Sequence, residues 1–318
     1  MSEPSVLVLH DNPDWLPPFE RAFDRAGVPL EPVHLGDVTL DLAEAPSGAV
    51  HWSRLSASAH TRGVPHAPEA AQAVLSRAEA AGRRVVNGTR AAALEVSKVR
   101  QYALLRAAGL DVPRTTAVTD RAALRAAAER FGAPFITKHN RGGKGLGVQR
   151  FDDVGTFAAV LDAGLLDEPV DGVWLLQELL VAPAPFVTRA EFVGGRFHYA
   201  VRVDTSTGFE LCPAEACALP GADGVAPPPL FALRPEVTAE HPLVVRLERL
   251  LAEQGIEIAG VEFFETVDGR TVPYDINTNT NYSPDVEESA EVPAADAIAR
   301  FFAGLVREHA EGVPAPAR

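Results

Sequence analysis

Glu262, Asp275 and Asn277 have the spacing of three oxygen ligands on one face of a β-hairpin. Two stretches of strand character flank an Asp268-Gly269 pair, which is a strong local signal for a hairpin turn. If the loop has two residues, Glu262 lies directly opposite Asp275, and Asn277, two residues further on, shares their face of the sheet. The spacing therefore predicts two facing carboxylates with an amide oxygen beside them.

Facing carboxylates on neighbouring strands repel each other unless a cation lies between them. A set of carboxylate and amide oxygens suits Mg²⁺ and is poorly suited to zinc. We therefore expect a magnesium site on this hairpin. The alternatives are a solvated hairpin face, or a β-bulge that changes the register.

The composition is that of an ordinary soluble globular protein. The chain has 318 residues, of which 47% are hydrophobic and 23% charged, enough for two or three lobes. Its net charge of −14 argues against nucleic acid or an anionic membrane as the main partner, but not against a small anionic ligand in a basic pocket. We find no signal peptide or membrane span, and we expect Cys212 and Cys217 to be free thiols. These features predict a cytoplasmic protein and leave a homo-oligomer open.

Short apolar strands alternate with helices over the first ninety residues, which predicts a small doubly wound α/β lobe. The expected strands are Ser5–His10, Pro32–Leu35, Gly48–Trp52 and Arg84–Asn87, and the expected helices are Asp14–Gly27 and Pro68–Ala81. Ligands of such sheets bind beyond the carboxyl ends of the strands. The polar stretch after the third strand therefore supplies candidate substrate contacts, Arg54, Ser56, Ser58, Thr61 and Arg62, although a plain surface loop is an equally good interpretation of this stretch alone.

A glycine-rich loop follows a strand at Phe135–Lys138. Glycines at 142, 143, 145 and 147 would let backbone N–H groups approach phosphates, and Arg141 and Lys144 would add positive charge. The stretch is neither a Walker A motif nor a dinucleotide-binding fingerprint, so by itself it is weak support for phosphate binding.

The remaining pattern predicts further helices and one long hairpin. We expect helices at Ala91–Ala108, Arg121–Phe131, Val154–Leu165, Pro242–Gln254 and Val292–Glu308, a strand at Val173–Leu180, a hairpin of Phe186–Val193 with Arg196–Val203, and an irregular loop at Pro213–Leu233. Arg189 and Arg202 lie on this hairpin. Beside a metal–phosphate site they would suit a transferring phosphoryl group, and elsewhere they would be surface charges.

The order of these features resembles the ATP-grasp superfamily, and within it the RimK-type and glutathione-synthetase-type carboxylate–amine ligases. The resemblance covers about residues 5–305 and rests on the ordered set rather than on one motif. It implies an α/β fold, with α+β character in the ATP-binding half, and three lobes. The expected ranges are 1–96 for the N-terminal lobe, 97–180 for the central lobe and 181–310 for the C-terminal lobe, with a disordered tail at 311–318.

The resemblance also implies roles for individual residues. ATP would be held by Lys98 and Lys138, by the glycine loop with Arg141, Gly143, Lys144 and Gly145, and by an adenine-reading hinge of Gln177, Glu178, Leu179 and Leu180. Glu262, Asp275 and Asn277 match the family's magnesium ligands, Arg189 and Arg202 would contact the phosphoryl or acyl group with Lys138, and Asn279 and Asn281 lie in the substrate-side loop. The chain departs from the family at Ala182, where an acid usually binds the ribose, so the ribose ligand stays open. It also has Asp275 in place of the commoner Glu, and Thr278–Tyr282 in place of a Pro-Gly turn.

The implied activity is an ATP-dependent ligation of a carboxylate, such as that of an amino acid or small peptide, to an amine through an acyl phosphate. The implied cofactors are ATP and Mg²⁺, two ions by the family pattern, with Mn²⁺ as an alternative metal. A small-molecule kinase on the same fold and a non-catalytic nucleotide-binding protein are the two alternatives.

Overall fold

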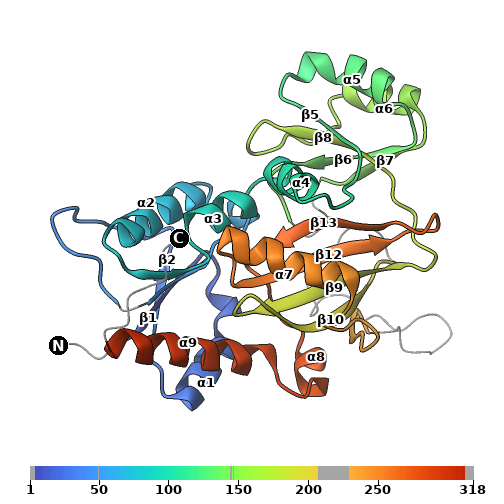
Figure 1. The fold of residues 1–318 in the computed structure, drawn as a ribbon. Helices are drawn as coiled ribbons and strands as arrows, with labels where there is room; N and C mark the ends of the chain where they lie inside the picture. Colours follow the sequence, from blue (N-terminus) through green and yellow to red (C-terminus); the bar gives the residue numbers. More distant parts are fainter. Residues whose placement is uncertain (1–3, 49, 144, 146, 207–228, 312–318) are drawn as a thin grey trace, which may run out of the picture.

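The computed structural model describes residues 4–48, 50–143, 145, 147–206 and 229–311, and these residues form three β-sheets (Figure 1). Lys144, Cys212, Cys217, most of the expected loop at Pro213–Leu233 and the tail beyond residue 311 lie outside the described residues. None of the helices in the described ranges is both long and apolar enough to span a membrane.

The N-terminal sheet is parallel throughout and has the strand order β2-β1-β3-β4, as the alternating pattern predicted. Its strands are β1 (Val6–His10), β2 (Leu30–His34), β3 (Val50–Arg54) and β4 (Arg84–Val86). Helix α1 (Pro17–Ala26), which follows the short 3-10 helix η1 (Pro13–Trp15), packs on one face, and α2 (Ala67–Ala80) packs on the other. This is a doubly wound lobe.

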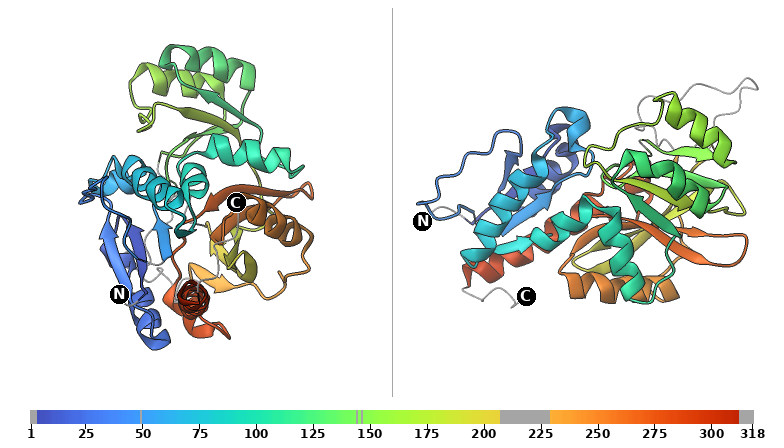
Figure 2. Two further views of the ribbon diagram at one scale, coloured as in Figure 1. Left: turned by 60° about the vertical axis from the view of Figure 1, so that its left-hand side comes forward. Right: turned by 90° about the horizontal axis from the view of Figure 1, so that it is seen from above.

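The C-terminal helix returns to this N-terminal sheet. Helix α9 (Ala294–Ala310) lies beside α1, and its Phe302 ring lies 5.5 Å from Phe23 and 5.0 Å from Trp52, between ring centroids (Figures 1 and 2). The apolar face of α9 is therefore buried by a lobe that begins almost three hundred residues earlier. The preceding short helix α8 (Pro284–Ser289) was not predicted.

The central sheet is antiparallel and has the order β5-β8-β6-β7. Its strands are β5 (Thr115–Val118), β6 (Phe135–His139), β7 (Gln149–Phe151) and β8 (Trp174–Glu178), and one face is covered by η3 (Arg121–Ala123), α5 (Leu124–Phe131) and α6 (Val154–Asp162). Phe135 and Leu176 point into that helical layer. Because side chains alternate along a strand, Lys138 and Gln177 point away from it, toward the C-terminal sheet.

The single helix expected at Ala91–Ala108 is two helices, α3 (Thr89–Glu95) and α4 (Lys98–Ala107). The break has a local cause, because the Ser97 hydroxyl accepts a hydrogen bond from the backbone N–H of Arg100 at 3.3 Å and caps the second helix. Tyr102 of α4 packs in the core of the C-terminal sheet rather than in that of the central sheet. Helix α4 belongs by sequence to the expected central lobe but packs on the C-terminal sheet. Helix α9 belongs by sequence to the expected C-terminal lobe but packs on the N-terminal sheet.

The C-terminal sheet is antiparallel and has the order β11-β10-β9-β12-β13. Its strands are β9 (Phe186–Val193), β10 (Arg196–Asp204), β11 (Phe231–Leu233), β12 (Ile258–Glu265) and β13 (Thr271–Asn277). Helix α7 (Pro242–Gln254) covers one face (Figure 1). The residues predicted to bind metal lie on the other face.

The β12–β13 hairpin has a different turn from the predicted one and still has the predicted pairing. The loop has three residues, because Thr266 donates its N–H to the carbonyl of Arg270 at 2.9 Å and Gly269 adopts a φ of 82°. This shifts the register by one residue. A bulge at Tyr274 shifts it back, so that Glu262 faces Asp275 as predicted.

Gly260 is expected to tolerate no side chain. A Cβ atom there would lie 2.9 Å from Glu191 Oε2, 3.1 Å from Thr280 Oγ1 and 3.2 Å from Arg189 Cδ. Because these three groups are hydrogen-bonded to one another or to the loop beyond β13, Gly260→Ala should lower the free energy of unfolding by about 1–3 kcal/mol.

The matched control is Gly304→Ala in α9, where a Cβ would meet no atom within 4 Å. That variant should be stabilised by about 0.4–1 kcal/mol, because alanine restricts the unfolded chain. Urea unfolding of both variants measures whether the free energy of unfolding falls in Gly260→Ala and rises in Gly304→Ala. A Gly260→Ala protein as stable as the wild type would contradict the close approach.

Candidate functional site

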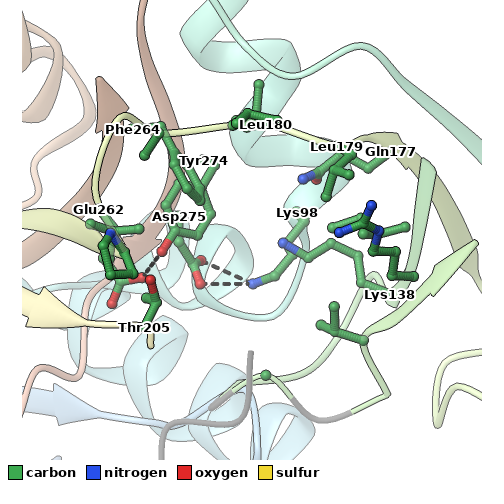
Figure 3. Close-up of a pocket in the computed structure, with 18 of the residues that line it drawn as sticks. Lys98, Lys138, Gln177, Leu179, Leu180, Thr205, Glu262, Phe264, Tyr274 and Asp275 are labelled. Atoms are coloured by element: carbon green, nitrogen blue, oxygen red, sulfur yellow. Dashed lines mark hydrogen bonds and ion pairs between the residues drawn. The ribbon is translucent and has the colours of Figure 1, made fainter. Parts of the chain in front are cut away.

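A pocket of about 540 Å³ lies between the central and C-terminal sheets, a size usual for cofactor sites. It brings together most of the residues predicted to bind nucleotide and metal: Lys98, Lys138, Gly143, Gly145, Gln177, Leu179, Leu180, Glu262, Asp275 and Asn277. Figure 3 shows Leu179 and Leu180 across the pocket from the carboxylates of Glu262 and Asp275. The carboxylates therefore lie on one side of the pocket, and the two leucines lie on the other side together with Lys138.

One side of the pocket carries two carboxylates that face each other across neighbouring strands. Glu262 pairs with Asp275, and Asn277 pairs with Gly260, so the three predicted oxygen ligands share one face. The Glu262 carboxylate accepts a hydrogen bond from the Tyr274 hydroxyl at 2.5 Å. Burial raises the pKa of Glu262, and the charge of Asp275 raises it further.

Lys98 supplies a cation to this pair. Its Nζ atom lies 2.9 Å and 3.1 Å from the two oxygens of Asp275 and donates to the carbonyl of Gly142 at 3.3 Å (Figure 3). The lysine is held there because it is the first residue of α4. No group of three or more His, Cys, Asp or Glu side chains that could hold a metal ion occurs in the described ranges. The two carboxylates and the Asn277 amide offer oxygen atoms as donors, and such a set would fit Mg²⁺.

Lys138 is buried on the opposite wall of the pocket. Its Nζ atom lies 3.4 Å from the Tyr102 hydroxyl and 5.5 Å from the centre of the Tyr274 ring. Burial and the nearby charge of Lys98 lower the pKa of Lys138 to about 7, although Asp275 and Glu262 act in the other direction. A phosphate group entering the pocket would restore its charge.

The hinge is positioned by a tyrosine that sequence reasoning missed. Tyr102 donates its hydroxyl hydrogen to Gln177 Oε1 at 2.7 Å, and it lies four residues after Lys98, one turn along the same face of α4. That spacing could have identified it from the sequence. The Glu178 carboxylate, in contrast, accepts hydrogen bonds from the Arg114 N–H at 2.9 Å and from Arg270 at 3.2 Å. Glu178 therefore holds the hinge to the segment before β5 and to the β12–β13 turn.

The two arginines predicted to flank the reacting group lie on opposite faces of the C-terminal sheet. Arg189 pairs with Glu262 and is therefore on the pocket face, whereas Arg202 pairs with Thr188, whose side chain points to the other face. The Arg202 guanidinium lies 4.8 Å from the Phe186 ring. The structure does not bring Arg202 to the site, because the strand register leaves it one residue out of phase with Arg189.

Arg189 belongs to a buried ion pair. Its Nε atom donates to Glu191 at 2.6 Å, and its guanidinium also donates to the carbonyl of Asn281 at 3.0 Å. Burial alone would lower the pKa of Arg189, but the carboxylates of Glu191 and Glu262 raise it above its ordinary value. This arginine is therefore a fixed cation beside the carboxylate pair.

The two stretches predicted to hold substrate lie against each other. The Arg54 guanidinium donates to the carbonyl of Thr280 at 3.3 Å and to Asn281 Oδ1 at 2.6 Å. Its charge also lies 4.3 Å from the centre of the Phe19 ring. Arg54 is thus buried beneath the segment Thr278–Tyr282, here called the asparagine loop, and two of its guanidinium nitrogens donate to this loop. It positions the loop.

Two further N-terminal residues hold the asparagine loop. Asn87 donates to the carbonyl of Thr278 at 3.0 Å, and Glu95 accepts from the N–H of Thr278 at 2.6 Å and from its hydroxyl at 2.9 Å. Burial raises the pKa of Glu95 to about 7.

Asn279 lies between Thr278 and Thr280, whose hydroxyls bind Glu95 and Glu191. It is buried, and neither the oxygen nor the nitrogen of its side-chain amide has a hydrogen-bond partner among the described residues. The Tyr282 hydroxyl of this loop is likewise buried without a partner among the described residues, so both side chains are left for a substrate.

The other predicted substrate contacts form a network in the N-terminal lobe. We call residues Leu55–Pro65, which include the 3-10 helix η2 (Ala59–Arg62), the N-lobe loop. The buried Asp11 carboxylate accepts from the N–H of Ser56 at 2.7 Å and from Arg62 at 2.5 Å. The hydroxyls of Ser56 and Ser58 lie 2.8 Å apart, and Thr61 donates to the carbonyl of Ser58 at 2.8 Å. These side chains hold the loop in one shape.

The glycine loop (residues 141–147) contributes Gly143 and Gly145 to the pocket, but not the side chain of Arg141. The Arg141 guanidinium instead donates to the carbonyl of Pro65 in the N-lobe loop, at 3.0 Å. The predicted phosphate contact of Lys144 falls outside the described residues.

No family model matches the chain, and no curated protein matches it. Solved structures do. A RimK-domain ATP-grasp protein from Sphaerobacter thermophilus DSM 20745 is 19% identical, with 93% of this chain and 98% of that one covered and a TM-score of 0.66. The chain has the ATP-grasp fold.

Two further ATP-grasp structures are similar over nearly the whole chain. The ATP-grasp ligase PsnB, complexed with a minimal precursor, is 20% identical, with 96% of this chain and 100% of PsnB covered and a TM-score of 0.66. The D-cycloserine synthetase DcsG is 20% identical, with 95% of this chain and 100% of DcsG covered and a TM-score of 0.64. The predicted fold class is confirmed.

Nucleotide binding by the ATP-grasp pocket should depend on pH through Lys138. Because its pKa is lowered to about 7, Lys138 is charged below this pH and neutral above it. Phosphates require the charged form, so ADP binding should take up a proton and weaken by up to about tenfold per pH unit between about pH 7.5 and pH 9.

Calorimetry in two buffers of different ionisation enthalpy measures both effects. Lys138→Arg is the matched control, because a guanidinium stays charged throughout this range, and its ADP affinity should vary less with pH. Wild-type affinity that is constant over this range, without proton uptake, would contradict the lowered pKa.

Proposed function

We propose that this protein is an ATP-dependent carboxylate–amine ligase. The observation that carries the proposal is the opposition of Lys138 to the Glu262–Asp275–Asn277 oxygen face in one pocket, with Lys98 beside them. Two lysines suit the phosphates of a nucleotide, and the oxygens suit the divalent ion that accompanies it. The apolar surface of Leu179 and Leu180 suits a purine base.

Each residue has a role that follows from its position. Lys138 would bind the α- and β-phosphates, and Gly143 and Gly145 would offer backbone N–H groups to the triphosphate. Glu262, Asp275 and Asn277 would hold Mg²⁺, in place of the Lys98 ammonium that now binds Asp275. The bound ion would neutralise charge on the β- and γ-phosphates. Lys98 would then be free to contact phosphate.

The reaction would proceed in two transfers. A substrate carboxylate oxygen attacks the γ-phosphorus of ATP, the bond to the β-phosphate oxygen breaks, and ADP and an acyl phosphate form. An amine then attacks the acyl carbon, phosphate leaves, and the amine proton is released. The protein contributes orientation and positive charge, because neither step needs a covalent enzyme intermediate. Arg189, beside Glu262, is the residue of this chain best placed to stabilise the reacting group.

The substrate class follows from what surrounds the asparagine loop. Arg189 presents fixed positive charge, and the unpartnered amide of Asn279 can both donate and accept a hydrogen bond. A short peptide offers a carboxylate and a peptide group, and an amino acid offers a carboxylate and an amino group, to match these two features. Two of the similar structures support this class, since PsnB is complexed with a precursor and DcsG is a D-cycloserine synthetase.

An ADP-release screen tests the proposal. The purified protein is incubated with ATP, Mg²⁺ and pairs of amino acids or dipeptides, and the products are identified by mass spectrometry. Amide formation with one ADP released per product is the expected outcome. A stable phosphorylated product without any amine requirement would instead identify a kinase, and nucleotide binding without ADP release for every pair would reject catalysis.

Asp275→Asn should abolish turnover while the fold survives. The substitution removes one of the two anionic metal ligands and the partner of Lys98, so ADP release should fall by at least about a hundredfold. Asp268→Asn, at the exposed tip of the same hairpin, is the matched control and should keep wild-type activity. Activity near the wild-type level in Asp275→Asn, with both variants folded by circular dichroism, would reject the metal assignment.

A further inference from the structure

Arg141, the first residue of the glycine loop, is directed to the N-terminal lobe. Only 8% of the residue is exposed, and its guanidinium donates to the carbonyl of Pro65 at 3.0 Å. Burial lowers the pKa of Arg141, and the carboxylates of Glu69, Asp171 and Asp11 oppose that effect. Two of these three acids belong to the N-terminal lobe. The N-terminal lobe therefore supplies the hydrogen-bond acceptor and most of the negative charge around this guanidinium.

The next residues lie close to the same N-lobe loop at a second point. A Cβ atom added to Gly143 would lie 3.8 Å from Ser58 Cβ and 3.9 Å from Ser58 Oγ, so there is no room for other atoms between the two segments there. The segment Arg141–Gly143 thus lies beside the N-lobe loop at Ser58 and binds it at Pro65. Ser58 is itself fixed, because its hydroxyl is bonded to Ser56 and accepts a hydrogen bond from Arg62 at 3.2 Å.

The other side of the same segment faces the metal-binding carboxylates. The carbonyl of Gly142 accepts a hydrogen bond from Lys98 Nζ at 3.3 Å, and Lys98 binds Asp275 at 2.9 Å. Three consecutive residues therefore join the N-lobe loop to Asp275 through Lys98. This is a continuous set of contacts between the predicted substrate contacts and the pocket.

We propose that Arg141 is a positioning residue that docks the segment Arg141–Gly143 onto the N-lobe loop and so couples the order of that loop to the position of Lys98. It is not a ligand of the nucleotide phosphates. As far as it concerns substrate, the inference rests on the proposed ligase function. A substrate that orders the N-lobe loop would favour the docked segment, and with it the contact of the Gly142 carbonyl with Lys98, because both depend on the same three residues.

Hydrogen exchange tests the docking in the whole protein without any substrate. Arg141→Met keeps most of the side-chain volume and removes every donor, and Arg141→Lys keeps one cationic donor. In Arg141→Met, backbone amides of residues 56–64 and 139–143 should both exchange at least about fivefold faster. Arg141→Lys should restore part of this protection.

Arg125→Ala is the matched control. Arg125 lies in the same central lobe, is exposed, and donates from its guanidinium to the carboxylate of Asp162 at 2.6 Å. In the Arg125→Ala variant, the amides of residues 56–64 and 139–143 should exchange as fast as in the wild type. Thermal unfolding of all the variants should confirm that they are folded.

Nucleotide affinity separates docking from phosphate binding. In Arg141→Met the Kd for ADP should stay within about twofold of the wild-type value if Arg141 only positions the segment. A Kd weakened by about tenfold or more, with unchanged exchange at residues 56–64, would overturn the proposal and make Arg141 a phosphate ligand.

Ligation provides the functional measurement. In Arg141→Met the KM for the carboxylate substrate should rise by about tenfold, because the N-lobe loop that carries the predicted substrate contacts loses its order, while the KM for ATP changes little, because Arg141 itself does not bind the nucleotide. Equal increases in both KM values would contradict the docking role. If no substrate pair yields an amide with the wild-type protein, the proposed ligase function fails, whereas the exchange result still decides the docking.

Discussion

The pairing of Glu262 with Asp275 places two like charges opposite each other on neighbouring strands. Much of the surrounding structure compensates their repulsion. Two buried carboxylates on neighbouring strands are unstable without a compensating cation. Lys98 supplies it, and this explains why α4 packs on the C-terminal sheet although it lies next to the central lobe in sequence. The same helix carries Tyr102, which binds Gln177 of the hinge. One helix thus connects both walls of the pocket.

A second set of polar contacts fixes the exit from the hairpin. Arg54, Asn87 and Glu95 all come from the first hundred residues, and all three bind the asparagine loop. Helix α9 packs against α1 and closes the N-terminal lobe from the other end of the chain. The C-terminal lobe is thereby held to the N-terminal lobe by buried hydrogen bonds, whose loss would leave unsatisfied polar groups. These contacts give the loop a defined shape beside the carboxylates.

The structure has the predicted strand pairing where local sequence carries the geometry. The facing of Glu262 and Asp275 survived a wrong loop length, because the bulge at Tyr274 cancels the shift introduced by a three-residue turn. Arg202 was wrong for a related reason. A strand places successive residues on opposite faces, so its partner Thr188 puts it on the face away from Arg189. Arg189 and Arg202 lie on the strands of one hairpin, and an irregularity between Phe197 and Tyr199 shifts its register by one residue, which the local pattern does not encode.

The sequence by itself determined the fold class and most of the predicted residues that line the pocket. Alternating apolar strands and helices, the glycine loop, the two lysines and the carboxylate hairpin are local patterns, and they predicted both. Only the tertiary structure decided which side chains are free to meet a ligand. Arg54, Glu178 and Arg141 have the charge of ligand contacts, but each is taken up by a partner at least 64 residues away in sequence. Such pairings arise when distant segments are buried together, because a buried charge must find whichever partner the fold brings to it.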